Sequence, residues 1–340
     1  MRGDVVRTIT GARRYGVAAA AAVGVVLLLG ACVPPPAPGP TVRPQPEGRG
    51  KVAGVQVAPS AGCSTPGGLP EGRSTITVAV GSGQRGARID VPAAATGTEP
   101  APVLVSLHPF SVNGAGWEGY SRLAQDAVAR GYVVITPNGS QPGPRWNVPG
   151  GVENGVDDIG YVAQLLDAAE DGACIDRNRE FAAGFSAGAA MAQALSCTLP
   201  WRMSAVAASG GANLTDLCPA SPATDVMVLH GTADPIAPVT GSNVPFATPN
   251  GLHIDDVVTT DAAWAGCAPV PTTEALFADV VVDRYEGCAD GARVEHWRLL
   301  GAGHTWAGTT APLLEIVTGP TNQSISANER VLDFFDGASA

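Results

Sequence analysis

Short apolar runs alternate along the chain with longer segments whose apolar residues recur at helical spacing. Two alternating runs at 76–80 and 87–91 predict an opening hairpin. Core strands are expected at 102–107, 133–136, 180–183, 226–229 and 293–299, and helices at 117–130, 156–171, 187–197 and 256–266. Because strands alternate with helices, the pattern predicts an α/β fold with a mostly parallel central sheet and helices on both faces.

The segment Gly184-Phe185-Ser186-Ala187-Gly188 places a serine between a predicted strand and a helix rich in small residues. On such a sharp turn the hydroxyl is exposed and the backbone is strained, and the flanking glycines let strand and helix pack closely. The motif alone is a weak signal in a chain with 43 glycines. The strand before it and the helix after it favour a catalytic nucleophile over a tight structural turn.

An acid and a base follow Ser186 in the order that α/β-hydrolases use, which is serine, then Asp or Glu, then histidine. Asp234 lies just beyond the predicted strand 226–229, and His304 lies in a glycine-rich loop after strand 293–299. A serine becomes a good nucleophile when an imidazole removes its proton, and a carboxylate fixes the tautomer of that imidazole. We therefore expect Ser186, Asp234 and His304 to form a catalytic triad.

The other histidines and acids have simpler explanations. Of the five histidines, His108 and His230 end apolar strands, where structural or rim positions are expected. His253 falls in a polar loop, and His296 occupies a strand position as a packed side chain. The competing acids do not follow a clear strand; they are Asp255, Asp256 and Asp261.

A serine hydrolase also needs two backbone N–H groups that form an oxyanion hole. One is expected from Ala187, the residue after the nucleophile. The other is expected just after strand 102–107, where Pro109 has no N–H, so Phe110 is the candidate donor.

The Pro/Gly-rich segment 138–154 is expected to be a long loop that shapes the substrate pocket. Trp146 in this segment and Trp306 beyond the candidate base are candidates for an acyl or aromatic pocket. The alternative is that both tryptophans pack loops onto the domain. Asp157 and Asp158, at the start of the next predicted helix, are expected to cap it.

The first 31 residues have the pattern of an export signal, with four arginines followed by an uncharged apolar run. Leu29-Gly30-Ala31-Cys32 resembles a bacterial lipobox, which would make Cys32 a lipidated N-terminus and a membrane anchor. The alternative is ordinary signal cleavage near Ala31. Residues 32–60 are proline-rich and are expected to be an extended tether, and residues 61–340 are expected to be one catalytic domain.

Six further cysteines remain, an even number that favours three disulfides in an exported chain. None has zinc-finger spacing and no histidine cluster accompanies them, so no metal is expected. The net charge is -11, and the segment after the four arginines is more acidic still. An acidic chain without basic runs disfavours nucleic acid as a partner.

The motifs in chain order resemble a known esterase family, that of secreted poly(3-hydroxybutyrate) depolymerases and feruloyl or acetyl xylan esterases, including its lipoprotein branch. They are Leu107-His108, Pro137-Asn138-Gly139, Arg145-Trp146-Asn147, Gly184-Phe-Ser186-Ala-Gly188, His230-Gly-Thr-Ala-Asp234 and Gly303-His304-Thr-Trp306. The resemblance covers about residues 61–337. Two turns depart from the family pattern: His108-Pro109 replaces His-Gly, and Trp306-Ala307-Gly308 replaces Trp-Pro-Gly.

The resemblance implies an α/β-hydrolase fold with Ser186, Asp234 and His304 as the triad. Sequence proximity and the family pattern favour the disulfides Cys197–Cys218 and Cys267–Cys288, which leaves Cys63–Cys174. The expected function is an exported serine carboxylic-ester hydrolase without a cofactor, with hydroxybutyrate oligomers or feruloyl or acetyl esters as substrates. The alternatives are a serine peptidase and a non-catalytic, ligand-binding surface lipoprotein.

Overall fold

The computed structural model describes residues 58–64, 68–140, 143–150, 155–199, 201–218, 224–241, 251–310 and 315–338. The chain divides into two compact units, Met1–Gly39 and Pro40–Ala340, and every described residue belongs to the second. The expected export signal, Cys32 and most of the expected tether lie outside the described residues. No helix in the described part of the chain is long and apolar enough to cross a membrane.

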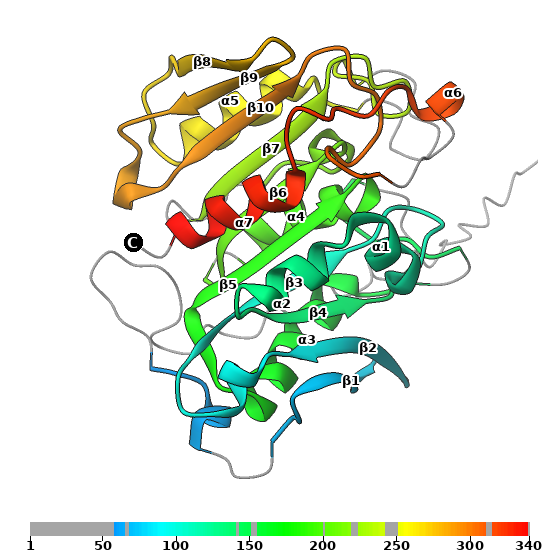
Figure 1. The fold of residues 1–340 in the computed structure, drawn as a ribbon, viewed down its shortest axis with the longest axis vertical. Coiled ribbons are helices and arrows are strands. Elements are labelled where there is room, and N and C mark those ends of the chain that lie inside the picture. Colours follow the sequence, from blue (N-terminus) through cyan, green and yellow to red (C-terminus); the bar gives the residue numbers. More distant parts are fainter. Residues whose placement is uncertain are drawn as a thin grey trace, which may run out of the picture. The chain divides into compact units, whose positions relative to one another are not determined.

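One ten-stranded sheet runs through the domain in the order β1-β2-β4-β3-β5-β6-β7-β10-β9-β8 (Figure 1). The six central strands are parallel, and β1, β2, β9 and β8 pair antiparallel at the two edges. The strands are β1 (Gly72–Val80), β2 (Gly83–Val91), β3 (Ala101–Leu107), β4 (Val133–Pro137), β5 (Ile175–Phe185), β6 (Met203–Ser209), β7 (Asp225–Gly231), β8 (Thr272–Phe277), β9 (Val280–Tyr285) and β10 (Val294–Leu299).

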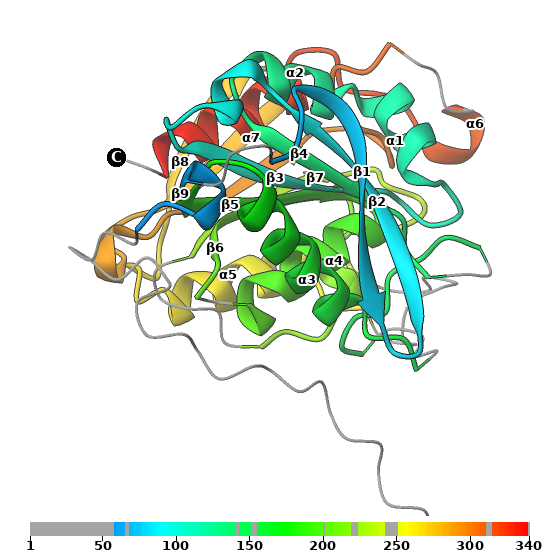
Figure 2. The ribbon, with the colours of Figure 1, turned by 90° about the horizontal axis from the view of Figure 1, so that it is seen from below.

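Helices cover both faces of this sheet, as expected for the α/β-hydrolase fold. Figure 2 shows α3, α4 and α5 on one face and α1, α2 and α7 on the other. The helices are α1 (Gly114–Ser121), α2 (Leu123–Ala129), α3 (Asp158–Gly172), α4 (Ala187–Thr198), α5 (Ile254–Trp264), α6 (Glu315–Thr318) and α7 (Ala327–Gly337). The predicted fold class is therefore confirmed.

Two apolar cores lie on the two sides of the sheet because successive strand residues point to opposite faces. In β7, Val226 and Val228 join one core, and Met227 and Leu229 join the other. The same alternation holds in β3, where all seven residues are buried. A strand covered on both faces has no polar side, which explains the continuous apolar runs in the sequence.

The prediction of one helix over 117–130 is wrong. The chain breaks at Arg122, which adopts a left-handed conformation with φ 58° and separates α1 from α2. The Ser121 hydroxyl accepts a hydrogen bond from the Leu123 N–H and so supports the new helix start. The predicted helix 256–266 is α5, which begins and ends two residues earlier.

Three strands were not predicted. β6 is fully buried but consists mainly of alanine and serine, residues that carry little strand propensity. β8 and β9 form an edge hairpin, and β8 is mostly exposed. An exposed edge strand lacks the continuous apolar run that predicts the central strands.

Three disulfides are formed, with the pairing Cys63–Cys174, Cys197–Cys218 and Cys267–Cys288. The first links residues 111 positions apart and ties the described N-terminal segment to the start of β5. The other two each span 21 positions. Disulfides of this number are typical of proteins that fold in an oxidising compartment outside the cytoplasm.

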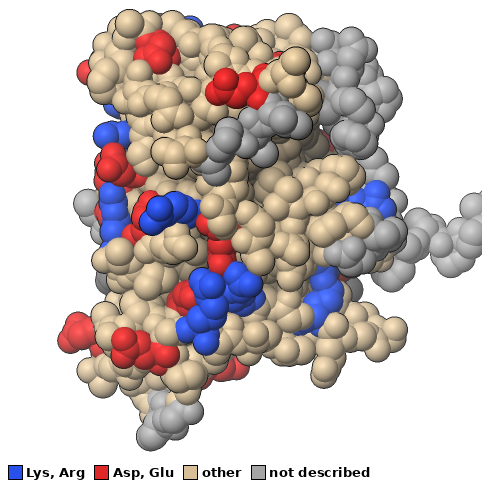
Figure 3. All heavy atoms as spheres, turned by 45° about the vertical axis from the view of Figure 1, so that its right-hand side comes forward, with Lys and Arg blue, Asp and Glu red and all other residues tan. Residues whose placement is uncertain are grey.

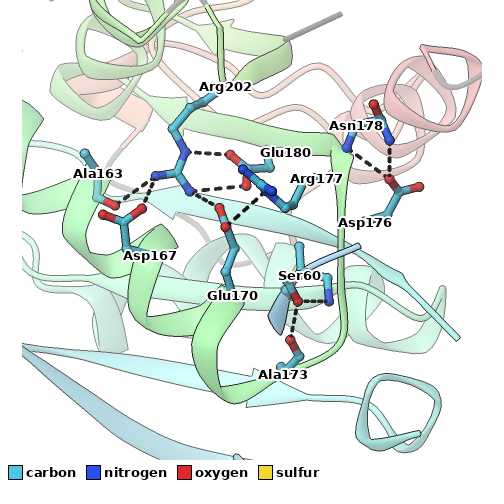
Figure 4. A network of polar contacts seen from close by, with 11 residues as sticks. Ser60, Ala163, Asp167, Glu170, Ala173, Asp176, Arg177, Asn178, Glu180 and Arg202 are labelled. Carbon is cyan, nitrogen blue, oxygen red and sulfur yellow. Dashed lines mark hydrogen bonds and ion pairs between the residues drawn. The ribbon is translucent and has the colours of Figure 1, made fainter. Parts of the chain in front are cut away.

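A buried guanidinium joins α3, β5 and the start of β6 (Figure 4). Arg202 contacts Glu180 at 2.8 Å and Asp167 at 2.6 Å, and it also pairs with Glu170. Arg177 adds a second cation 3.3 Å from Glu170. Arg202 is 6% exposed and Glu180 2%, so the charges compensate one another where water is largely excluded.

A buried carboxyl group without a cation lies between α4 and α5. Asp261, 2% exposed, accepts a hydrogen bond from Gln193 Nε2 at 2.9 Å. Asp261 Oδ1 and Gln193 Oε1 are both buried and have no partner among the described residues. Burial raises the pKa of Asp261 to about 7. A protonated Asp261 would therefore supply the donor that the amide oxygen of Gln193 lacks.

Replacing Arg202 by methionine should lower the free energy of unfolding by about 3–5 kcal/mol, because it leaves buried carboxylates without their cation. Urea denaturation monitored by circular dichroism measures the loss. Arg130→Met is the matched control: this arginine pairs with Asp333 and Asp336 at the surface, so we expect a change below about 1 kcal/mol. Equal effects of the two substitutions would contradict a special role for the buried network.

Asp261→Asn should stabilise the protein at pH 8 and have little effect at pH 4. With its folded pKa raised to about 7, the native aspartate holds a proton that the unfolded chain releases above about pH 4, so rising pH destabilises the wild type through this window. Asparagine keeps the shape and removes the ionisation, so we expect a gain of up to about 4 kcal/mol above pH 7. Urea midpoints measured from pH 4 to 8 test this; a pH-independent difference would refute it.

Candidate active site

Ser186 occupies the sharp turn between β5 and α4, with φ 56° and ψ -119°. This is a strained conformation for a residue with a side chain, and such strain is typical of a nucleophile turn. The Ser186 N–H donates to the Ser209 carbonyl of β6 at 2.9 Å, which holds the turn against the neighbouring strand. Ser186 as a whole is 8% exposed, so the turn is largely buried.

Two glycines allow the turn to form. A Cβ on Gly184 would lie 2.2 Å from the Gly188 carbonyl oxygen, and a Cβ on Gly188 would lie 2.2 Å from the Leu107 carbonyl oxygen. No side chain fits at such distances, so the end of β3 and the start of α4 approach here as bare backbone. The Gly-x-Ser-x-Gly spacing therefore has a steric cause in this fold.

The loops after β7 and β10 bring the candidate acid and base together. His304 Nδ1 lies 2.7 Å from Asp234 Oδ2, and both residues are 5% exposed. Asp234 Oδ1 accepts the backbone N–H groups of Ile236 at 2.8 Å and Ala237 at 2.7 Å. These bonds leave Oδ2 directed at the imidazole, which fixes the tautomer with the proton on Nδ1 and the free nitrogen Nε2 available.

The loop after β6 lies against both the serine and the histidine. A Cβ on Gly211 would be 3.0 Å from the Ser186 Cα, and one on Gly210 would be 3.5 Å from His304 Nδ1. The rings of Phe185 and His304 are 4.7 Å apart. Ser186 and His304 thus border the same Gly-Gly segment, although they lie 118 positions apart in the sequence.

Three other histidines, His108, His253 and His296, make contacts that give each of them a structural role. His108 Nε2 accepts from the Gly139 N–H and Nδ1 donates to the Pro109 carbonyl, both at 2.8 Å, so it fixes the loop after β3. Burial lowers the pKa of His108 to about 4. His253 caps α5 by accepting from the Asp255 N–H. His296 is buried in β10 as a packed side chain, with its pKa lowered to about 4 by burial.

The candidate oxyanion donors lie on the two elements that meet at Gly188. Ala187 begins α4, and no backbone hydrogen bond from its N–H occurs within the described residues. The Cβ position of Gly188 lies 2.8 Å from the His108 carbonyl oxygen, so the β3 loop that carries Phe110 runs beside the helix start. The loop is further held by a hydrogen bond from the Ser111 N–H to the Pro144 carbonyl at 2.8 Å.

A cavity of about 600 Å³ opens beside this loop. Polar and apolar residues line it, and four of the eight come from the predicted long loop: Arg85, Gly86, Asn113, Asn138, Gly139, Ser140, Pro144 and Val156. Arg85 is anchored there by Asp158 at 2.6 Å, and Asp157 caps α3 as expected by accepting from the Gly160 N–H. Asp158 therefore serves an ion pair and not a cap.

The two tryptophans are packed inside the domain. Trp146 is 5% exposed and donates its indole N–H to the His108 carbonyl at 2.8 Å. Trp306 is 1% exposed, donates to Asn328 Oδ1 at 2.8 Å and packs edge-on against Trp117. Both indoles have partners within the domain, which favours the packing interpretation over a pocket lined by these residues.

Among the described residues no group of three or more metal-ligating side chains lies together. On the face shown in Figure 3, arginines are interspersed with acidic side chains and do not form a basic band. Where charges of both signs mix in this way, that face offers no track for a polyanion.

Comparisons with known proteins agree with this geometry. The family described as "Esterase PHB depolymerase" matches residues 87–253, a stretch that contains Ser186 and Asp234. Feruloyl esterase B of Piromyces equi is 27% identical over 226 residues, which cover 64% of this chain and 42% of that protein. This chain thus spans less than half the length of that relative.

Two further similarities extend over nearly the whole length of the related protein. "Putative esterase NocK" of Nocardia uniformis is 28% identical across 96% of this chain and 98% of its own length. The solved acetyl xylan esterase from Aspergillus awamori superposes with a TM-score of 0.54 at 17% identity, covering 77% of this chain and 99% of that one, a likeness in fold. Residues 87–253 thus match the esterase family of poly(3-hydroxybutyrate) depolymerases, and feruloyl esterases are among the proteins to which this chain is similar.

Proposed function

We propose that this protein is a serine carboxylic-ester hydrolase that works outside the cytoplasm through an acyl-enzyme on Ser186. The observation that carries the proposal is the buried hydrogen bond between His304 Nδ1 and Asp234 Oδ2, next to a serine on a strained strand-to-helix turn. Ser186 and His304 border the same Gly210-Gly211 segment, which supports the proposal that the histidine activates the serine hydroxyl.

In the first step Ser186 Oγ attacks the ester carbonyl while His304 Nε2 takes its proton. Asp234 stabilises the imidazolium that forms and keeps its orientation. The N–H groups of Ala187 and Phe110 hold the negative oxygen of the tetrahedral intermediate. His304 then protonates the leaving alcohol, and a water molecule activated by the same histidine hydrolyses the acyl-enzyme and restores Ser186.

The substrate is a neutral ester of the kind that the relatives' names indicate: a feruloyl or acetyl ester, or a hydroxybutyrate oligomer. The cavity beside the β3 loop is the candidate site for the group attached to the ester, because Gly139 in its lining is hydrogen-bonded to His108 of that loop. The side-chain oxygens of Asn113 and Asn138 accept from Gly116 and Gly114, so their amide NH2 groups are the candidate donors to a hydroxyl or carbonyl oxygen of the substrate. Two alternatives remain testable in the same assay, a serine peptidase and a ligand-binding protein without turnover.

Ser186→Ala should lower kcat by on the order of 10⁵–10⁶-fold, because it removes the proposed nucleophile. Asp234→Asn should lower kcat by on the order of 10⁴-fold, because it removes the carboxylate that fixes the tautomer of His304. The assay uses the oxidised protein with aryl acetates, methyl ferulate, hydroxybutyrate oligomers and a peptide amide. Asp255→Asn is the control, an exposed acid at the start of α5 that should retain wild-type turnover. Equal turnover by wild type and Ser186→Ala would overturn the proposal, and cleavage of the amide alone would indicate a peptidase.

We also propose that the mature chain begins at a lipidated Cys32 and is held at a membrane by residues 32–60, with residues 61–340 as the catalytic domain. The support is the sequence Leu29-Gly30-Ala31-Cys32 after an apolar run, followed by proline-rich chain.

Cys32→Ser should move the protein from the membrane fraction to the soluble exported fraction of a bacterial host and abolish incorporation of a labelled fatty acid. The physical reason is the loss of the acyl chains, each of which adds about 0.8 kcal/mol per buried methylene to membrane affinity. A wild-type protein that is soluble and unlabelled would instead show ordinary signal cleavage.

A further inference from the structure

His230 is a buried histidine that the proposed reaction does not use. It lies in β7, four residues before Asp234, and is 1% exposed. Its Nε2 is 2.7 Å from the Ala237 carbonyl oxygen. A carbonyl oxygen only accepts, so Nε2 carries the proton and donates. His230 Nδ1 is then a bare acceptor, buried and without a partner among the described residues.

The residue that accepts from His230 is the same one that donates to the candidate acid. Ala237 donates its N–H to Asp234 Oδ1 at 2.7 Å and accepts the His230 Nε2–H through its carbonyl. The turn from Asp234 to Ala237 is therefore tied to β7 by the His230 side chain. Its Nε2 also lies 3.8 Å from Asp234 Oδ2, the oxygen that faces His304.

We propose that His230 is a positioning residue for Asp234: its Nε2–H closes the turn that holds the carboxylate and so aims Oδ2 at His304. This inference rests on the proposed function and adds a residue to its machinery. An aliphatic side chain would fill the same space without leaving a ring nitrogen buried and unpaired, which costs about 1–3 kcal/mol. The one hydrogen bond that His230 does make explains why a polar ring is retained here.

The charge state of His230 depends on its burial and on the groups beside it, which include His296 of β10. Burial lowers the pKa of His230; the Asp234 carboxylate and the hydrogen bond to the Ala237 carbonyl act in the opposite direction, and His304 adds to the decrease. From β10, Arg298 lies beside it in register, but this arginine is paired with Asp283 at 2.9 Å. His230 is thus neutral at neutral pH and presents no second cation to Asp234, so His304 is the only imidazole that the carboxylate orients.

The chain supplies a matched control on the same face of the sheet. His296 pairs in register with Val228, two residues before His230, and is 3% exposed. Its Nε2 is also buried without a partner among the described residues, and its Nδ1 lies 3.7 Å from Asp255. No hydrogen bond joins it to the described turn after β7. His296 therefore shares the burial and chemistry of His230 but not its contact with Ala237.

The test compares His230→Leu, His230→Gln and His296→Leu in the full-length oxidised protein. His230→Leu should lower kcat about 10–100-fold with KM changed less than about threefold, since the acid is misaligned but the substrate site is intact. His230→Gln, whose Nε2 can donate to Ala237, should recover kcat to within about fivefold of wild type. His296→Leu should leave kcat unchanged.

A second readout does not depend on turnover. The His304 Nδ1–H proton in the bond to Asp234 gives a low-field proton signal in ¹⁵N-histidine-labelled protein, assigned by its loss in His304→Ala. His230→Leu should shift or broaden this signal, and His230→Gln and His296→Leu should preserve it. If His230→Leu does not fold, His230→Phe replaces it as a ring without a donor.

The outcomes separate the two proposals. A wild type that hydrolyses no ester but whose signal shifts in His230→Leu would refute the proposed function and support the positioning role. A wild type that is active while His230→Leu retains both kcat and the signal would overturn the positioning role. So would equal losses in His230→Leu and His230→Gln, or the same changes in His296→Leu, because the hydrogen bond to Ala237 would then not be the cause.

Discussion

The close approach of bare backbone between β3, β5 and α4 is the constraint on which the site depends. Gly184 and Gly188 let α4 start directly against the end of β3, so the chain must turn sharply at Ser186 and adopt φ 56° there. The same contact places the first N–H of α4 beside the loop that follows β3. The positions of Ser186 and of the Ala187 N–H thus follow from one packing arrangement, and a larger residue at Gly188 would displace both.

The buried titratable side chains differ in the charges that lie beside them. His108, His230 and His296 are buried, and burial lowers the pKa of each. The His304 imidazole bonds a carboxylate oxygen, which lies 2.7 Å from its Nδ1. Far from this site, Arg202 pairs with two buried glutamates. Where no such cation exists, as at Asp261, burial raises the pKa of the acid instead.

The strand ends that carry the candidate site can be predicted from the sequence, because a buried parallel strand appears as a continuous apolar run followed by a loop. The order of Ser186, Asp234 and His304 could be predicted for that reason. β6 could not, since alanine and serine give no strand signal although the strand is fully buried. The ties that hold the loops, such as His230 to Ala237 and Trp146 to the His108 carbonyl, depend on tertiary proximity and leave no local pattern.

The order of the strands explains why the loop after β6 consists of two glycines, Gly210 and Gly211. β3, β5, β6, β7 and β10 are consecutive in the sheet, and the loops after them carry Phe110, Ser186, Gly210-Gly211, Asp234 and His304 in that order. Neighbouring strands are about 4.8 Å apart, so β10 lies about 14 Å from β5, farther than a serine and a histidine side chain can span from straight strand ends. The β10 loop must therefore fold back across the end of β6. Glycine at both positions of the β6 loop lets this loop pack directly against the Ser186 turn: a Cβ at Gly211 would meet the Ser186 carbonyl oxygen at 2.2 Å, and one at Gly210 would lie 3.1 Å from the Phe185 ring. The absence of side chains at the end of β6 is thus as much a condition of the candidate site as the three candidate side chains at the neighbouring strand ends.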